Sequence, residues 1–159
     1  MNQIRYVMGD ATSPPGNDPK IIVHVCNDLG RWGRGFVLAI SKRWKEPERV
    51  YKASFMAPRS PVLGDVQFVP VEASIVVANL IGQHGVATRA TKTAPVRYDA
   101  IRTGLSKVAE HARLLGASVH MPRIGCGLAG GSWATIEPII DETLVTSDVA
   151  VTVYDFASV

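Results

Sequence analysis

Twice along this chain of 159 residues, a short apolar run is followed by a glycine-rich loop and then by a helical pattern. The first run, residues 21–26, is almost entirely apolar, which is typical of a strand buried on both faces. It leads into a glycine loop over 30–35, and the second run, 118–121, leads into a glycine loop over 125–131. Strands that alternate with helices in this way predict a three-layer α/β/α sandwich.

The spacing of apolar residues predicts the remaining elements. Strands are expected at 4–8, 66–69, 74–81 and 150–154, and helices at 36–44, 47–55, 96–115 and 136–145. The connections from 4–8 to 21–26 and from 66–69 to 74–81 are too short for helical crossovers. The central sheet is therefore expected to be mixed but mostly parallel.

The helix over 96–115 has the clearest pattern. Five residues form one apolar stripe at 4-3-4-3 spacing, namely Ile101, Leu105, Val108, Ala112 and Leu115. Gly116 follows the stripe and is expected to end the helix. In the helix over 136–145, Pro138 must lie in the first turn or kink the helix, because proline has no amide hydrogen to donate.

The composition indicates one globular domain over residues 1–159. Apolar residues make up 47% of the chain and charged residues 19%, a balance that favours a folded core over disorder. No apolar run approaches the roughly 18 residues of a membrane span, and the first residues lack the apolar core of a signal peptide. We expect a cytoplasmic protein without a membrane partner, and a monomer.

Charge and cysteine spacing narrow the class of ligand. The net charge is +3, but no run of Lys and Arg exceeds two residues, which favours a polyanionic small molecule over nucleic acid as a partner. Cys26 and Cys126 lie far apart and lack the spacing of a metal site, so they are expected to be free thiols. We expect no bound metal and no cofactor.

The two glycine loops are the features most suited to binding a ligand. Glycine lets the backbone adopt a positive φ and lets a ligand approach the amide groups closely. The helix that begins after each loop adds partial positive charge at its N-terminus. If the two preceding strands are neighbours, both loops meet at one edge of the sheet and form a crevice that suits a diphosphate. The alternative is that both loops are tight turns whose glycines serve packing alone.

The motifs in these loops differ from the common nucleotide-binding signatures. The first loop reads G-x-x-G-x-G, not the dinucleotide-binding G-x-G-x-x-G, and no G-K-[ST] occurs. Residues 121–128 read M-P-R-I-G-C-G-L, and residues 24–35 contain H-V-C-N and W-G-R-G. The first strand ends in Y-V-M-G-D at 6–10, and the last reads V-T-V-Y at 151–154. With these segments the chain resembles, over nearly its whole length, a macrodomain, the family of ADP-ribose-binding folds. It is most similar to the branch of ADP-ribose-protein glycohydrolases and ADP-ribose-1″-phosphate phosphatases.

The resemblance implies how ADP-ribose would be held. Asp10 would accept a hydrogen bond from the adenine amino group beside the Ala11 amide, which fits a carboxylate that can only accept. Asn27 would bond to the distal ribose, unless it forms an Asx turn. The other implied contacts are Gly33, Gly35, Phe36 and Val37 at the distal ribose and phosphates, Gly125, Cys126, Gly127, Leu128, Ala129 and Gly130 across the diphosphate, and Tyr154 and Phe156, past the last strand, beside the adenine.

The sequence departs from this branch at two positions that matter for catalysis. The glycohydrolases carry a lysine where this chain has Gln83, and an aspartate where it has Ala129. A glutamine cannot attack the ribose as a lysine can, so covalent lysine catalysis is excluded at this position. Hydrolysis would then depend on a positioned water molecule, with Gln83, His84, Asn27 and Asp28 as candidate catalytic residues.

Three functions remain open at this level. The leading one is binding of ADP-ribose and its hydrolysis from modified Glu or Asp side chains of partner proteins. The alternatives are a binding module that recognises ADP-ribosylated proteins without turnover, and a phosphatase acting on ADP-ribose 1″-phosphate. His24 is expected to be structural because it lies inside a buried strand, and Trp32 either lines the ribose site or packs against the sheet.

Overall fold

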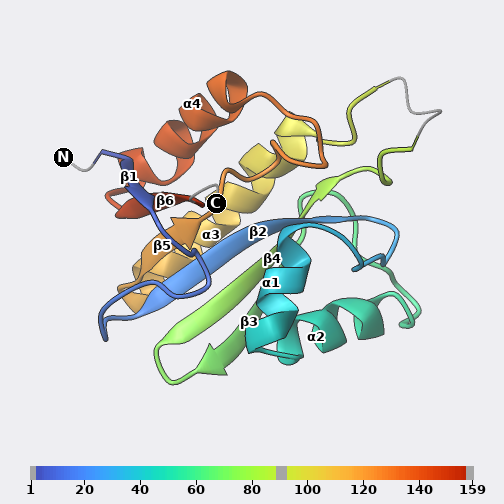
Figure 1. Cartoon of the computed structure of the whole chain (residues 1–159), viewed down its shortest axis with the longest axis horizontal. Coiled ribbons are helices and arrows are strands. Elements are labelled where there is room, and N and C mark those ends of the chain that lie inside the picture. The colour runs from blue at the N-terminus through green and yellow to red at the C-terminus, as the bar shows by residue number, and fades with distance from the viewer. Residues whose placement is uncertain (1–2, 89–92, 157–159) are drawn as a thin grey trace.

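The computed structural model describes residues 3–88 and 93–156 (Figure 1). Its elements in chain order are β1 (Arg5–Met8), β2 (Lys20–Asn27), α1 (Phe36–Arg43), α2 (Glu46–Ser54), β3 (Val66–Glu72), β4 (Ile75–Gln83), α3 (Tyr98–Leu115), β5 (Ser118–Met121), α4 (Trp133–Thr143), a 3-10 turn η1 (Val145–Ser147) and β6 (Val151–Asp155). The strands form one sheet in the order β1-β6-β5-β2-β4-β3. Helices α1 and α2 cover one face and α3 and α4 the other, as Figure 1 shows, which confirms the predicted sandwich.

Strand pairing confirms a mixed, mostly parallel sheet. Among the six strands of the described residues, only β3 runs antiparallel to its neighbour, in the short hairpin with β4 that the sequence predicts. The other short connection, from β1 to β2, does not reverse the strand direction as predicted, because both strands run parallel to their neighbours and are separated by β6 and β5. Residues 9–19 run back between them as an irregular segment, and at roughly 3.3 Å per residue such a segment spans a strand length without a helix.

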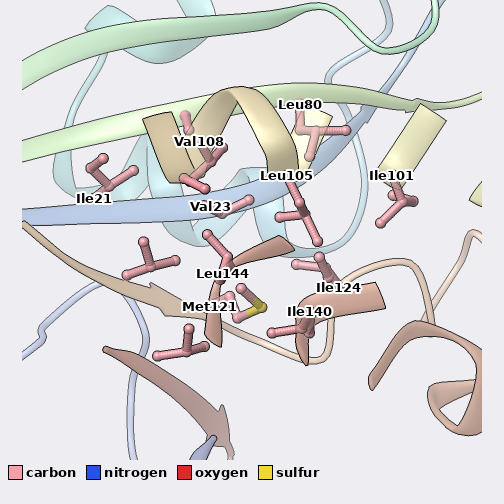
Figure 2. Close-up of a cluster of buried hydrophobic side chains, with 14 of the residues drawn as sticks. Ile21, Val23, Leu80, Ile101, Leu105, Val108, Met121, Ile124, Ile140 and Leu144 are labelled. Carbon is pink, nitrogen blue, oxygen red and sulfur yellow. The ribbon is translucent and has the colours of Figure 1, made fainter. Parts of the chain in front are cut away.

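The core lies on both faces of the central strands. On the side of α3 and α4, a cluster of aliphatic side chains from these helices meets β2, β4, β5 and β6, and Figure 2 shows part of it. On the other side, Ile22 of β2 packs with Trp32, Ile40 and Tyr51. Strand β2 is therefore buried on both faces, as its apolar sequence predicts, and its carboxyl end is held firmly in place.

Two details of the helices differ from the sequence prediction. The apolar stripe of α3 ends at Ala112, because Leu115 is 44% exposed at the last turn. Helix α4 begins at Trp133, three residues earlier than predicted, so Pro138 lies inside the helix beyond its first turn. Gly116 ends α3 in a left-handed conformation, as expected. Among the described residues, no helix combines the length and apolar character needed to cross a membrane.

Candidate functional site

A crevice of about 410 Å³ opens at the carboxyl ends of β2, β4 and β5. It is lined by His24, Val25, Arg34, Gly35, Phe36, Val37, Gln83, Pro122, Arg123, Ile124, Gly125, Gly127, Leu128 and Ala129. Residues of both glycine loops thus line the same crevice, because the strands that precede the loops, β2 and β5, are parallel neighbours. Larger hollows lie away from both loops: two, of about 650 and 630 Å³, along α3, α4 and η1, and one, of about 520 Å³, at the start of α3. We take the crevice as the candidate site, since it alone among these hollows joins the two loops.

Part of the predicted ligand set lines this crevice and part lies around it. The predicted residues in the wall are Gly35, Phe36, Val37, Gln83, Gly125, Gly127, Leu128 and Ala129. Those outside the wall are Asp10, Ala11, Asn27, Asp28, Gly33, His84, Cys126, Gly130, Tyr154 and Phe156. Leu128, half exposed, reaches across to the first loop, where its Cδ1 lies 3.3 Å from the position of a Cβ on Gly35. The two loops therefore touch, and the site is a crevice with a shared rim.

The side chain of Asn27 stabilises the first loop through hydrogen bonds to the loop backbone. Its side-chain Oδ1 accepts hydrogen bonds from the amides of Leu29 (2.9 Å) and Arg31 (3.2 Å), and its Nδ2 donates to the Arg31 carbonyl (2.7 Å). The hydroxyl of the fully buried Tyr51 lies 2.6 Å from the Asn27 carbonyl and 2.8 Å from Oδ1. The Asx turn that the sequence left open is present, and most of the bonding capacity of Asn27 serves the loop. Its contact with the ribose stays a prediction.

The second loop contains glycines of two kinds. Gly131 is required by packing, because its amide donates to the Gly125 carbonyl at 2.7 Å and a Cβ there would lie 2.5 Å from that oxygen. Gly127 differs, since a Cβ on it would meet nothing within 4 Å and the residue faces the crevice. The packing alternative thus explains Gly131 but not Gly127. Open space beside the backbone of a crevice wall is what close approach of an anion needs.

Three polar side chains meet where β2 and β4 end. Asp28 Oδ1 accepts a hydrogen bond from the Gly85 amide and Oδ2 lies beside His84 Nδ1, each at 2.8 Å. Gln83 Nε2 donates to the Gly85 carbonyl at 2.9 Å. Partial burial pushes the pKa of Asp28 up, but the bonds from Gly85 and His84 outweigh it and hold that pKa below its usual value. Asp28, His84 and Gln83 are therefore brought together, and Asn27 pairs with Gln83 across β2 and β4. Of these four candidate catalytic residues, Gln83 alone lies in the crevice wall.

The predicted adenine end is only partly as expected. Asp10 Oδ1 accepts from the amide (2.8 Å) and hydroxyl (2.7 Å) of Thr12, so this carboxylate caps a turn. Tyr154 does not lie past the last strand as predicted, because it belongs to β6, with 7% of its surface exposed and its hydroxyl 2.7 Å from His120 Nδ1. Its contact with the adenine stays a prediction. Phe156 follows β6 and is 73% exposed, so it can stack on a ligand.

His24 is a buried residue of the crevice wall, and Trp32 packs behind it in the core. The ring of His24 is buried, its Nε2 lies 2.6 Å from Asn79 Oδ1, and burial lowers its pKa to about 4. Trp32 packs edge-on against this ring and donates from Nε1 to Ser41 Oγ at 2.7 Å. Of the two alternatives for Trp32, packing against the sheet is the one that the structure shows. Burial raises the pKa of both the Cys26 and Cys126 thiols, so neither is activated.

The sequence reasoning missed the role of Arg123. Its guanidinium makes two hydrogen bonds to Asp155, at 2.6 and 3.0 Å. It also lies over the rings of Tyr6 and Trp133, at 5.2 and 5.0 Å from their centres. These partners come from β6, β1 and α4, so no local pattern reveals them. Arg123 thereby ties one wall of the crevice to the edge of the sheet.

Comparisons with known proteins identify the family. No family model matches the chain. A solved macrodomain protein from Streptomyces coelicolor is 52% identical, with a TM-score of 0.85 over 98% of this chain and 100% of that one. This chain belongs to the macrodomain family. A Bacteroides thetaiotaomicron protein of unknown function is similarly close to this macrodomain, at 53% identity and a TM-score of 0.93 over 97% of this chain and 98% of that one.

Curated relatives of this macrodomain include larger proteins. The mouse chromodomain-helicase-DNA-binding protein 1-like is 34% identical over 96% of this chain, which spans only 18% of that protein. A more distant relative matches over almost its full length: the bovine ADP-ribose glycohydrolase OARD1 is 24% identical, over 96% of this chain and 91% of its own. The yeast ADP-ribose 1″-phosphate phosphatase is also 24% identical, over 97% of this chain and 99% of its own.

Proposed function

We propose that this macrodomain binds ADP-ribose in the crevice and hydrolyses the ester that joins ADP-ribose to a Glu or Asp side chain. The observation that carries this proposal is that both glycine loops and Gln83 line one crevice at the carboxyl ends of adjacent strands. Relatives that are an ADP-ribose glycohydrolase and an ADP-ribose 1″-phosphate phosphatase support the choice of ligand and of a hydrolytic reaction.

The geometry supports binding of a diphosphate between the two loops. Gly127 leaves space beside the backbone, and no side chain caps the N-terminus of α1, where Phe36 and Val37 line the crevice. Arg34 adds a positive charge to the same wall. Backbone amides, helix N-termini and a cation together favour an anion in this position.

For hydrolysis, the reacting end of the ligand would lie beside Gln83. A water molecule adds its oxygen to the distal ribose C1″ or to the ester carbonyl, the ester C–O bond breaks, and ADP-ribose and a free carboxylic acid result. An ester of this kind is activated, so orientation of the water and exclusion of bulk solvent can supply much of the rate enhancement. Gln83 is the residue of the crevice wall suited to orient that water.

The direct test follows release of ADP-ribose from a protein carrying glutamate-linked mono-ADP-ribose, with ADP-ribose 1″-phosphate as a second substrate. Gly127→Glu should abolish both binding and turnover, because it fills the phosphate site and adds like charge. Ser106→Glu, which adds the same charge on an exposed part of α3, is its control. Gln83→Ala should keep the affinity for ADP-ribose within a few-fold and lower turnover roughly tenfold to a thousandfold.

The alternatives predict different outcomes of the same test. A binding module would hold ADP-ribose tightly and release none from either substrate. A phosphatase would release phosphate from the second substrate and leave the protein ester intact. Wild-type turnover in the Gln83→Ala variant would reject Gln83 as the residue that orients water and shift attention to the first loop.

A further inference from the structure

One carboxylate organises both residues that follow β4 at the end of the crevice. Asp28 Oδ1 accepts from the Gly85 amide, and Oδ2 lies 2.8 Å from His84 Nδ1. The Asp28 side chain is 18% exposed, and its own backbone amide donates to the Gln83 carbonyl at 3.1 Å. The carboxylate is therefore fixed on the end of β2 and holds the turn 83–85 at the end of β4.

The backbone of Gly85, through the peptide groups on its two sides, links Asp28 to the side chain of Gln83. Its amide is bound by Asp28, and its carbonyl accepts from Gln83 Nε2 at 2.9 Å. A carbonyl can only accept, so the side-chain atom beside it must be the nitrogen of the amide. Gln83 lines the crevice, and within residues 3–88 and 93–156 its Oε1 oxygen has no hydrogen bond, so this is the end of the amide available to a ligand.

We propose that Asp28 is a positioning residue that acts through Gly85 to hold the Gln83 amide, so that Gln83 meets its target as a hydrogen-bond acceptor. This inference rests on the proposed function for its target, which would be a water molecule or a hydroxyl of the distal ribose. A neutral amide oxygen accepts a hydrogen bond from water without removing a proton. Gln83 thus orients the water. Its proton passes, directly or through solvent, to the departing carboxylate when water attacks C1″, or to the departing C1″ oxygen of the ribose when water attacks the ester carbonyl.

His84 is the other route by which Asp28 could act, and it is the weaker one. The His84 side chain is 62% exposed, and a surface contact between a histidine and a carboxylate contributes little in water. Gln83, by contrast, lies in the wall of the crevice. We therefore assign the effect of Asp28 to the path through Gly85.

Two substitutions at position 28 separate these routes. Asp28→Ala removes the acceptor for Gly85 and should lower kcat on the glutamate-linked substrate tenfold or more, with affinity for free ADP-ribose changed only a few-fold. Asp28→Asn keeps an acceptor for the Gly85 amide but turns an NH2 group toward His84. It should restore most of the turnover lost in Asp28→Ala, and His84→Ala should slow the reaction less than Asp28→Ala does.

A double variant tests the coupling directly. If Asp28 acts through Gln83, adding Asp28→Ala to Gln83→Ala should slow the reaction no further than Gln83→Ala alone. Multiplied effects of the two substitutions would overturn the inference. An Asp28→Asn variant as slow as Asp28→Ala would also overturn it, because that result would mean that Asp28 acts through its contact with His84.

An NMR measurement keeps the inference separate from the proposed function. The side-chain NH2 signal of Gln83, assigned by its loss in Gln83→Ala, should move in Asp28→Ala and stay near its wild-type position in Asp28→Asn. An unmoved signal in Asp28→Ala would reject the link through Gly85. If the wild type shows no turnover, the proposed function fails, while this measurement still decides whether Asp28 positions Gln83.

Discussion

Asp10 combines a local and a ligand-directed role in one carboxylate. Within the described part of the chain, both hydrogen bonds of the Asp10 carboxylate use Oδ1 and come from Thr12. That arrangement leaves Oδ2 for the adenine amino group that the resemblance to macrodomains implies. The same carboxylate can therefore shape the turn after β1 and recognise the base, and a single alanine substitution would remove both contributions together.

We predict that Asp10→Ala lowers affinity for ADP-ribose about tenfold to a hundredfold, since a hydrogen bond to a charged group contributes roughly 1.5–3 kcal/mol. Asp10→Asn separates the two roles, because it keeps an oxygen for Thr12 but faces the adenine amino group with an NH2 group. Calorimetry should show that both variants bind weakly and that an inosine analogue binds weakly to the wild type. Wild-type affinity in Asp10→Asn would mean that Asp10 serves the turn alone.

At the scale of elements, the packing of α3 on β4 depends on a glycine that the hydrophobic stripe does not reveal. Gly104 faces the sheet, and a Cβ on it would lie 2.5 Å from Cγ of the fully buried Leu80. Figure 2 shows how closely Leu80 and this helix, with Leu105 and Ile101, share the core. The absence of a side chain at this position lets the helix approach the strand.

Gly104→Ala should therefore destabilise the protein although alanine favours helices. The gain in helix propensity is about 1 kcal/mol, whereas forcing a methyl group into a filled core typically costs about 1–3 kcal/mol. We expect the free energy of unfolding in urea to fall by about 1 kcal/mol. Ser106→Ala, on the exposed side of the same helix, should stay within about 0.5 kcal/mol. A more stable Gly104→Ala protein would show that Leu80 can move aside.

For the whole molecule, two buried histidines link folding to pH. His24 and His120 are 1% and 6% exposed, and burial lowers the pKa of each to about 4. In the unfolded chain a histidine has a pKa of about 6.5. Below that value the unfolded chain takes up protons that the folded protein does not. The contribution of these two histidines to the free energy of unfolding is therefore fully present above pH 6.5 and is lost as the pH falls toward 4.

Urea unfolding should consequently show a lower midpoint at pH 5 than at pH 7. Each histidine contributes a slope of up to about 1.4 kcal/mol per pH unit in this window. His24→Gln removes one of the two groups, so this variant should lose less stability between pH 7 and pH 5 than the wild type. Equal midpoints at both values, or an equal loss in the variant, would contradict the burial of these rings as the cause.

Local sequence patterns were sufficient to predict most of the elements and the place of the crevice. Apolar runs such as 21–26 identified the central strands, and the short link between β3 and β4 identified the one antiparallel pair. Glycine loops after two buried strands indicated a site at the carboxyl edge of the sheet. These features depend on residues close together in the chain, whose periodicity and turn chemistry can be recognised without knowledge of the rest.

Only the tertiary structure decided the strand order and the state of individual side chains. It placed β1 at the edge beside β6, buried Tyr154 against His120, and placed the Arg123 guanidinium over the rings of Tyr6 and Trp133. It also bound the Asn27 side chain to its own loop and joined Asp28 to Gln83 through the backbone of Gly85. Each of these outcomes depends on contacts between segments far apart in the sequence. Whether a polar group is free for a ligand is known only when all of its neighbours are in place.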